Sequence, residues 1–255
     1  MSRDIDTTRP HTGRVYDYLL GGTQNFAADR QAADALAKLV PGVRAIAQLN
    51  RWFLQLVAAR WAAEGYTRVL DLGSGLPTQG HFNEQIPKGR ILFSDHDALS
   101  VTYGQQLLKD NPNMGYLHAD MRQPQPLLDA AAQFFADNRQ LAIGFIGLSY
   151  FLPDEDVRTL ARTLHAFCAP GSVLAMSYFL PVPESGPSAE LLKVYTRMLN
   201  TRFYMRTPEL VAELLAPWRI TEQDSVETWL DVPHLLTAED RLSNQFKLQG
   251  LFAVY

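Results

Sequence analysis

The stretch Thr67-Arg68-Val69-Leu70-Asp71-Leu72-Gly73-Ser74-Gly75 predicts a short buried strand that ends in a glycine-containing turn. Gly73 and Gly75 lack a Cβ, so the backbone there can turn tightly and approach a ligand closely. The preceding residues have a different period. Apolar residues recur at steps of three and four from Val43 to Glu64, which predicts an amphipathic helix with one buried face that ends at Gly65.

The same strand-then-helix pattern continues downstream of this turn. Further strands are expected at 90–94, 114–118, 141–148 and 172–179. Helices are expected between them at 98–109 and 126–136, and from Pro153 to Pro170. Strands that alternate with helices predict an α/β fold with a parallel sheet and right-handed crossovers.

The C-terminal third is less regular. Helices are expected at 188–201 and from Thr207-Pro208 to Leu215, where Thr207 is the N-cap. Strand candidates at 219–223 and 249–255 would close the sheet as an antiparallel pair and bring it to seven strands. The N-terminal residues add a short helix at 28–40, and we expect the first dozen to be flexible. We therefore divide the chain into an N-terminal arm and helical extension, 1–64, and a sheet domain, 65–255.

Composition narrows the class of protein and its surroundings. A length of 255 residues fits one large domain, and a net charge of −4 argues against nucleic acid as the main partner. Cys168 is the only cysteine and follows Leu164 at helical spacing, so we expect a buried structural thiol. No signal peptide is evident, and the longest apolar run is too short to span a bilayer. We expect a cytoplasmic protein without a membrane partner.

Acidic residues follow the first two strands, where ligands bind in open α/β sheets. Asp71 precedes the first glycine, and a carboxylate there suits a cationic amine better than a pyrophosphate. Asp95 lies 20 residues beyond Gly75, where an acid can accept both hydroxyls of a ribose, and His96 adjoins it. The alternative for Asp95 is a helix cap.

The next two strand ends complete this set. Asp120 can accept from an adenine amino group while Met121 covers a ring face, although Asp in a loop is often only a turn former. Ser149 and Tyr150 follow the fourth strand, where the reacting end of a ligand would lie. Tyr150 could equally be a core aromatic.

Two other groups of residues carry weaker signals. His81, His96 and His118 fall near strand ends but lack ligand spacing, so we expect no metal. Arg44, Arg51 and Arg60 lie along one predicted helix, and we expect them on its solvated face.

The N-terminal string from Arg14 to Arg30, RVYDYLLGGTQNFAADR, is more specific. Together with Asp71-x-Gly73-x-Gly75, Asp95 and Asp120-Met121 it resembles a family of bacterial S-adenosylmethionine (SAM)-dependent methyltransferases long carried as a domain of unknown function. The resemblance spans roughly residues 10 to 255 and implies a Rossmann-like class I methyltransferase fold, with helices on both faces of the sheet and an N-terminal helical extension.

The resemblance also implies a cofactor site. It assigns SAM contacts to Gly73, Gly75, Asp95, Asp120 and Met121, and we add Ser74, His96, Asp71 and Ser149 from their positions. Pro77 and Thr78 depart from the small residues that many methyltransferases carry, which leaves the path of the loop open. The acceptor is not supplied by the resemblance, and we expect a small molecule.

Two interpretations of the N-terminal string remain open. It could be a lid over the methionine end of SAM and the acceptor, with Tyr16, Tyr18, Gly22 and Asn25 at the site and Leu19, Leu20 and Phe26 as anchors. It could instead be a packed arm in which Asn25 is an N-cap.

The catalytic residues and the oligomeric state are not predicted. His11, Tyr16, Tyr18, Tyr150 or Tyr178 could assist a hydroxyl acceptor. Two rival functions are an NAD(P)-dependent oxidoreductase, which would need a third glycine where Thr78 stands, and a non-catalytic SAM-binding protein.

Overall fold

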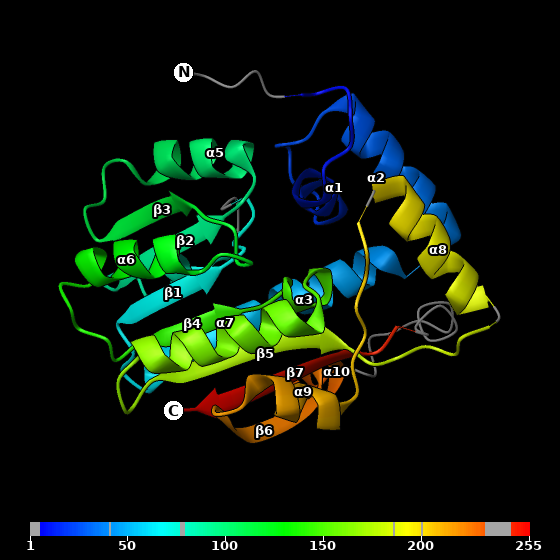
Figure 1. The fold of residues 1–255 in the computed structure, drawn as a ribbon. Helices are drawn as coiled ribbons and strands as arrows, with labels where there is room; N and C mark the ends of the chain where they lie inside the picture. The colour runs from blue at the N-terminus through cyan, green and yellow to red at the C-terminus, as the bar shows by residue number, and fades with distance from the viewer. Residues whose placement is uncertain (1–5, 41, 77–79, 186, 200, 233–245) are drawn as a thin grey trace.

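The computed structural model describes residues 6–40, 42–76, 80–185, 187–199, 201–232 and 246–255. Within them, seven strands form one sheet in the order β3-β2-β1-β4-β5-β7-β6 (Figure 1). The strands are β1 (Arg68–Leu72), β2 (Arg90–Asp95), β3 (Met114–His118), β4 (Ala142–Phe145), β5 (Val173–Phe179), β6 (Arg219–Ser225) and β7 (Leu248–Val254). The first five are parallel, whereas β7 runs antiparallel to both of its neighbours.

The strand order reverses between β1 and β4. The chain runs outward from β1 to β3 and then returns to β4 beside β1, where Asp71 is in register with Gly144. The helices that follow β1 and β4 leave the sheet on opposite sides of this point, which opens a crevice beyond the carboxyl ends of the strands. The expected ligand site therefore falls at a position that the topology itself creates.

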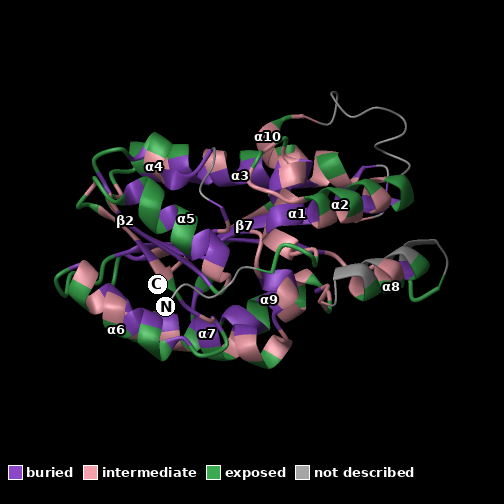
Figure 2. Ribbon diagram, turned by 90° about the horizontal axis from the view of Figure 1, so that it is seen from above, coloured by how far each residue is buried: buried purple, intermediate pink, exposed green. Residues whose placement is uncertain are grey.

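Helices cover both faces of the sheet (Figures 1 and 2). One face carries α3 (Val43–Ala63), α4 (Phe82–Gln85), α5 (Ala98–Leu108) and α10 (Val226–Leu230). The other carries α6 (Gln125–Phe134), α7 (Asp154–Phe167) and α9 (Pro208–Leu215). Buried Val157, Leu160, Ala161 and Leu164 give α7 the apolar stripe that holds it on the sheet.

A third group of helices lies beyond the carboxyl ends of the strands (Figure 1). It consists of α1 (Thr12–Leu19), α2 (Ala27–Leu39) and α8 (Pro187–Leu199), and α2 packs against both of the others. Val15, Leu36 and Val40 belong to a separate small core that joins α1 and α2 to the start of α3. These helices cover the crevice.

Most of the elements expected from the sequence are confirmed with ends shifted by a few residues. The antiparallel pair is confirmed, with the added finding that β7 lies between β5 and β6. Thr207 caps α9 by accepting a hydrogen bond from the Leu210 N–H, and Cys168 is buried, which raises its pKa to about 12. Among the described residues, no helix is long and apolar enough to cross a membrane.

The N-terminal region is more ordered than expected. Helix α1 was not predicted, because it buries Arg14, whose Nε donates to Asp29 Oδ2 at 2.8 Å. The N-cap at Asn25 is wrong: α2 begins after Phe26, and the Asp29 carboxylate accepts from the Phe26 N–H at 2.8 Å. The short helices α4 and α10 were also missed.

Candidate functional site

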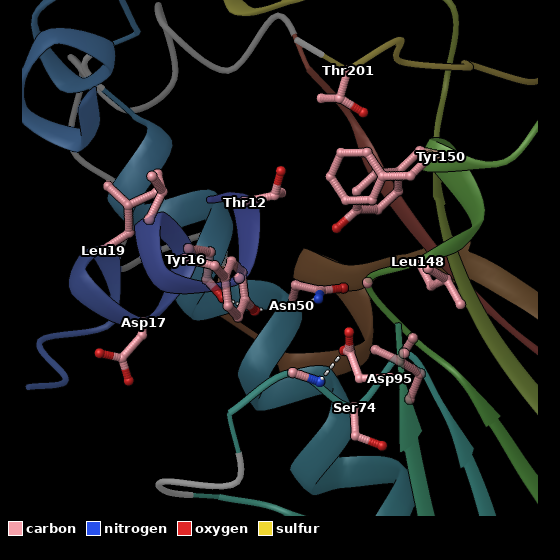
Figure 3. A pocket seen from close by; sticks show the side chains of 18 of the residues that line it. Thr12, Tyr16, Asp17, Leu19, Asn50, Ser74, Asp95, Leu148, Tyr150 and Thr201 are labelled. Atoms are coloured by element: carbon pink, nitrogen blue, oxygen red, sulfur yellow. Dashed lines mark hydrogen bonds between the residues drawn. The ribbon is translucent and has the colours of Figure 1, made fainter. Parts of the chain in front are cut away.

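A cavity of about 370 Å³ lies in the crevice, between the strand ends and helices α1 and α3 (Figure 3). Eight residues expected from the strand-end motifs line it: Asp71, Gly73, Ser74, Gly75, Asp95, His96, Asp120 and Met121. Tyr16 and Tyr150 line it as well. The sequence motifs therefore converge on one hollow.

The glycine turn after β1 forms one side of the cavity. Gly73 and Gly75 both have φ near +65°, a conformation that side chains with a Cβ rarely adopt. A Cβ on Gly73 would lie 2.8 Å from the Leu148 side chain, whereas a Cβ on Gly75 would meet nothing within 4 Å. The backbone at Gly75 is thus bare toward open space, as close approach by a ligand requires. Pro77 and Thr78 lie outside the described residues.

Asp95 braces this turn. Its Oδ2 accepts from the Gly75 N–H and its Oδ1 from the Asp97 N–H, both at 2.8 Å. The turn is fixed from the other side by Tyr116, whose hydroxyl donates to the Gly75 carbonyl. Asp95 is not itself the helix cap that was the alternative, because the Asp97 side chain caps α5 by accepting from the Ser100 N–H.

Two histidines lie beside the carboxylates that follow β2, His96 beside Asp95 and His11 beside Asp97. Burial opposes the charge of Asp95, but the His96 ring and the two backbone N–H donors outweigh this and lower the pKa of Asp95. The His96 Nδ1 lies 3.3 Å from Asp95 Oδ1, and this contact raises the pKa of His96. His11, the N-cap of α1, lies 3.6 Å from Asp97 Oδ1, and burial lowers its pKa. Helix α1 thus meets the end of β2 at the rim of the cavity.

Asp120 and Met121 lie farther along the same rim. Both carboxylate oxygens of Asp120 accept from the Arg122 guanidinium, and this pairing lowers the pKa of Asp120. The sequence prediction did not include Arg122. Because Arg122 occupies the Asp120 oxygens, they are only partly available to another donor. Met121 is buried among apolar residues of the α6–α7 face while also lining the cavity.

Asp71 and Arg51 are buried side chains that line the same cavity, and the structure describes no hydrogen-bond partner for some of their polar atoms. Asp71 is 1% exposed, and its Oδ2 has no hydrogen-bond partner among the described residues. Burial raises the pKa of Asp71 to about 7. Arg51 is 9% exposed, and its Nε and Nη1 have no hydrogen-bond partner in the part of the chain that the structure describes. Buried polar groups of native proteins are nearly always paired, so both groups point to a ligand that would pair them. The expectation that Arg51 is solvated is wrong.

The floor of the cavity is a hydrogen-bonded chain between α1, α3 and β5. The Tyr16 hydroxyl donates to the Ala47 carbonyl at 3.0 Å and accepts from Asn50 Nδ2 at 3.3 Å. The Asn50 Oδ1 accepts from Ser177 Oγ at 2.7 Å. Tyr150 lies across the cavity from Tyr16, with Asn50 between them (Figure 3).

The other predicted residues have structural partners. Ser149 is fully buried and its Oγ donates to the Ser177 carbonyl at 2.6 Å, which argues against a cofactor contact. The Arg44 guanidinium lies over the Tyr18 ring, with its Cζ 5.1 Å from the ring centroid. Gly22 and Asn25 belong to the α1–α2 turn, where Asn25 Nδ2 donates to Asp17 and to the Gly22 carbonyl. Tyr178 is buried, and its hydroxyl accepts a hydrogen bond from Gln223 Nε2, which argues against a role as a general base.

Arg51, Asn50 and Arg206 were not predicted for the site. Helical spacing could have found the first two: Arg51 shares a buried stripe with Ala47, Leu54 and Ala58, and Asn50 shares one with Phe53, Val57 and Trp61. Arg206 lies on an irregular segment, so no periodicity marks it. In the described part of the chain, no three His, Cys, Asp or Glu side chains converge as metal ligands would.

Comparisons with known proteins agree with this geometry. A solved structure from Thermobifida fusca, assigned provisionally as a methyltransferase, is 28% identical with a TM-score of 0.85 and covers 98% of this chain and 96% of its own. A DUF574 family protein from Streptomyces avermitilis is 27% identical with a TM-score of 0.83 and covers 98% of each chain.

More distant structures share the fold. Magnesium protoporphyrin IX methyltransferase from Synechocystis PCC 6803, solved with bound S-adenosylhomocysteine (SAH), is 14% identical with a TM-score of 0.54 and covers 94% of this chain and 92% of its own. No curated protein matches the sequence. A family model described as S-adenosyl methyltransferase matches residues 1–242. The chain therefore belongs to the S-adenosyl methyltransferase family and is a SAM-dependent methyltransferase with a class I Rossmann-like fold.

Proposed function

We propose that this methyltransferase holds SAM in the crevice cavity and transfers its methyl group to a small molecule that enters beneath α1, α2 and α8. The adenosine end would contact Asp95, His96, Asp120 and Met121, and the amino-acid end would contact Asp71 and Arg51. Membership of the family decides against an NAD(P)-dependent oxidoreductase. A cytoplasmic location is part of the proposal.

The unpaired atoms of Asp71 and Arg51 carry the proposal. The amino-acid end of SAM is a zwitterion, with one ammonium and one carboxylate. Asp71 Oδ2 can accept from the ammonium, and Arg51 Nε and Nη1 can donate to the carboxylate. A ligand with both charges would satisfy two buried groups that otherwise cost stability.

The Gly75 side of the cavity fits an adenosine. The bare backbone at Gly75 lets a ligand approach closely. Each oxygen of the Asp95 carboxylate accepts from one backbone N–H. The Oδ1 atom also has His96 Nδ1 at 3.3 Å, so Oδ2 is the oxygen that retains a second lone pair for a ribose hydroxyl. Ser74 would contribute backbone only, because its Oγ bonds to the Asp71 carbonyl.

Methyl transfer from SAM requires little acid–base catalysis from the protein. SAM supplies a methyl group on a positively charged sulfur, which is already activated for transfer. Holding two reactants in line can contribute about 7–11 kcal/mol, whereas a general base adds about 10²–10⁴-fold. Tyr16 is unsuited to act as a base, because its hydroxyl already donates to Ala47 and accepts from Asn50. Exclusion of water and orientation by the cover are the main roles we propose for the chain.

The proposed cover over the cavity consists of α1 and α2, with α8 packed against α2. Helix α3 shares a core with the sheet through Phe53, Val57 and Trp61, so it belongs to the body although it precedes residue 65. Helices α1 and α2 have their own small core and meet the body at His11 and Tyr16. This division narrows the predicted N-terminal arm and helical extension, residues 1–64, to a cover formed by α1 and α2.

Two ligands test the proposal, one with the amino-acid end of SAM and one without it. In Arg51→Gln, SAH should bind at least tenfold more weakly than in the wild type, about 1.4 kcal/mol. 5′-Methylthioadenosine, which lacks the amino-acid end, should bind both proteins equally. Arg44→Gln is the matched control on the same helix, because Arg44 is half exposed and pairs with Asp34. Equal loss of both ligands, or no loss of SAH, would reject the assigned orientation.

A further inference from the structure

We infer that the methyl acceptor is an uncharged aromatic small molecule with an apolar substituent, such as an alkylphenol or an alkylaniline. The inference rests on the proposed function and names the substrate class of the same cavity. It comes from the part of the cavity that lies beyond the Gly75 turn, which we call the acceptor chamber.

One wall of the acceptor chamber is aromatic. The rings of Tyr150 and Phe203 are stacked, with centroids 4.7 Å apart and planes 23° apart. Phe151 and Phe179 contact Tyr150 edge to face, at 4.7 Å and 4.9 Å. All four line the cavity. Aromatic rings prefer such stacked and edge-to-face neighbours, so a flat aromatic ligand extends this cluster without strain.

The aromatic wall is held rigidly. Arg206 is fully buried, and its guanidinium donates to the carbonyls of Ser149 and Leu152 on either side of Tyr150. The Tyr204 N–H donates to the Tyr150 carbonyl at 2.8 Å, which ties the segment carrying Phe203 to the same loop. A surface fixed in this way selects by shape, because it cannot move aside for a poorly fitting ligand.

The facing wall is aliphatic. Leu19 lies across the cavity from Tyr150 (Figure 3). It belongs to a set of aliphatic residues from α1, α2 and α3 that line the cavity: Leu19, Leu20, Leu36, Val40, Val43 and Ile46. An apolar substituent on the ligand would bury its surface against them, and the burial of apolar surface favours binding.

The charges around the chamber leave none for an ionised acceptor. Among the described lining residues the only arginines are Arg51, beside Asp71, and Arg122, which is paired with Asp120. No lysine lines the described part of the cavity. The Asp17 carboxylate accepts from the Gln24 N–H and from Asn25 Nδ2, so it holds the α1–α2 turn. A carboxylate or ammonium on the acceptor would be buried without a partner, at a high cost.

Polar side chains lie at the boundary between the chamber and the Gly75 turn, and the hydroxyls of Thr12 and Thr201 belong to residues that also line the cavity. A Cβ on Gly147 would lie 2.9 Å from Asn50 Nδ2 and 3.7 Å from the Tyr150 hydroxyl, so both groups flank the end of β4. The Tyr16 hydroxyl adjoins Asn50. An oxygen or nitrogen attached directly to an aromatic ring would meet these groups while its ring lies on the aromatic wall.

The first test compares ligands that differ in the apolar substituent or in charge, and measures their binding to the wild-type protein saturated with SAH. 4-Butylphenol should bind at least tenfold more tightly than phenol, and 4-butylbenzoate, which carries a carboxylate, should bind at least tenfold more weakly than 4-butylphenol, as measured by calorimetry. If 4-butylbenzoate binds as tightly as 4-butylphenol, or if no phenol binds while SAH does, the inference is overturned. If SAH itself fails to bind, the proposed function fails instead.

The second test fills the chamber. Leu36 is buried and Leu39, one turn later on α2, is 42% exposed. Leu36→Trp should weaken 4-butylphenol binding at least tenfold and phenol binding by a smaller factor, whereas Leu39→Trp should change neither. SAH binding and the thermal unfolding profile verify that Leu36→Trp is folded. Unchanged 4-butylphenol affinity in a folded Leu36→Trp protein would overturn the aliphatic wall.

Discussion

The Asp95 carboxylate accepts a hydrogen bond from the backbone N–H of Gly75 at 2.8 Å, across 20 residues of sequence. This contact joins the end of β2 to the turn after β1 and brings an acid to the bare backbone of Gly75. Asp95 is therefore a brace for the turn as well as a candidate ribose ligand. Any variant at Asp95 must be interpreted with both roles in mind.

Gly75→Ala should abolish or strongly weaken SAH binding while costing only about 1–2 kcal/mol of stability, because the new Cβ would project into the cavity from a residue with positive φ. Gly65→Ala is the matched control: Gly65 also has positive φ and open space around its Cβ position, but it ends α3 away from the cavity. Calorimetric titration with SAH and urea unfolding measure the two effects. Similar SAH affinities in the two variants would show that the Gly75 backbone does not face the ligand.

SAH affinity should increase as the pH rises from 6 to 8. Burial raises the pKa of Asp71 to about 7, so the carboxyl is largely protonated at pH 6 and ionised at pH 8. Only the ionised form can pair with the ligand ammonium. The affinity at pH 6 should be about tenfold below its plateau at pH 8, since one pH unit below a pKa leaves about a tenth of the group ionised. Asp71→Asn should flatten this profile, and an unaltered slope in that variant would assign the titration to another group.

The same shift predicts the pH dependence of stability without ligand. The folded-state pKa of Asp71 lies above its ordinary value of 3.8, so the folded protein favours the protonated carboxyl. Its contribution to stability is complete below about pH 4 and is lost as the pH rises through about 7. Urea unfolding of the wild type and of Asp71→Asn at pH 5 and pH 8 measures the contribution of Asp71 to the free energy of unfolding. The difference in this free energy between the two pH values should be smaller in the variant.

Arg206→Ala should destabilise the fold by about 3 kcal/mol or more. The buried guanidinium donates to Asp154 Oδ1 and to the carbonyls of Ser149 and Leu152, and its removal leaves these acceptors unpaired. Arg202→Ala is the control, because Arg202 is exposed and only lies over the Tyr204 ring at 5.0 Å. A urea midpoint for Arg206→Ala that equals the control would contradict the anchoring role.

The sheet and the strand-end acids could be predicted because they depend on local sequence. Short apolar strands such as Arg68–Leu72, followed by glycine or acid, mark their own carboxyl ends, and in a parallel sheet these ends meet at one edge. The position of β7 between β5 and β6 could not be predicted, because strand order depends on pairing over long sequence separations.

Other features were missed for separate reasons, one of them a partner distant in the sequence and two of them local. The Arg14–Asp29 ion pair stabilises α1 across 15 residues, so a polar segment became a buried helix. Arg51 was assigned to solvent because its charge outweighed the buried stripe on which it lies. Asp120 was predicted as a ligand contact, yet its partner Arg122 is only two residues away and competes for the same oxygens.

The most direct test of SAM binding at the Gly73–Gly75 turn is parallel calorimetric titration of the wild-type protein and Asp95→Ala with SAH and with NAD. The structure predicts that SAH binds the wild type, that NAD does not, and that Asp95→Ala loses at least tenfold in SAH affinity, about 1.4 kcal/mol, while remaining folded by circular dichroism. Binding of NAD in place of SAH, or unchanged SAH affinity in a folded Asp95→Ala protein, would contradict it.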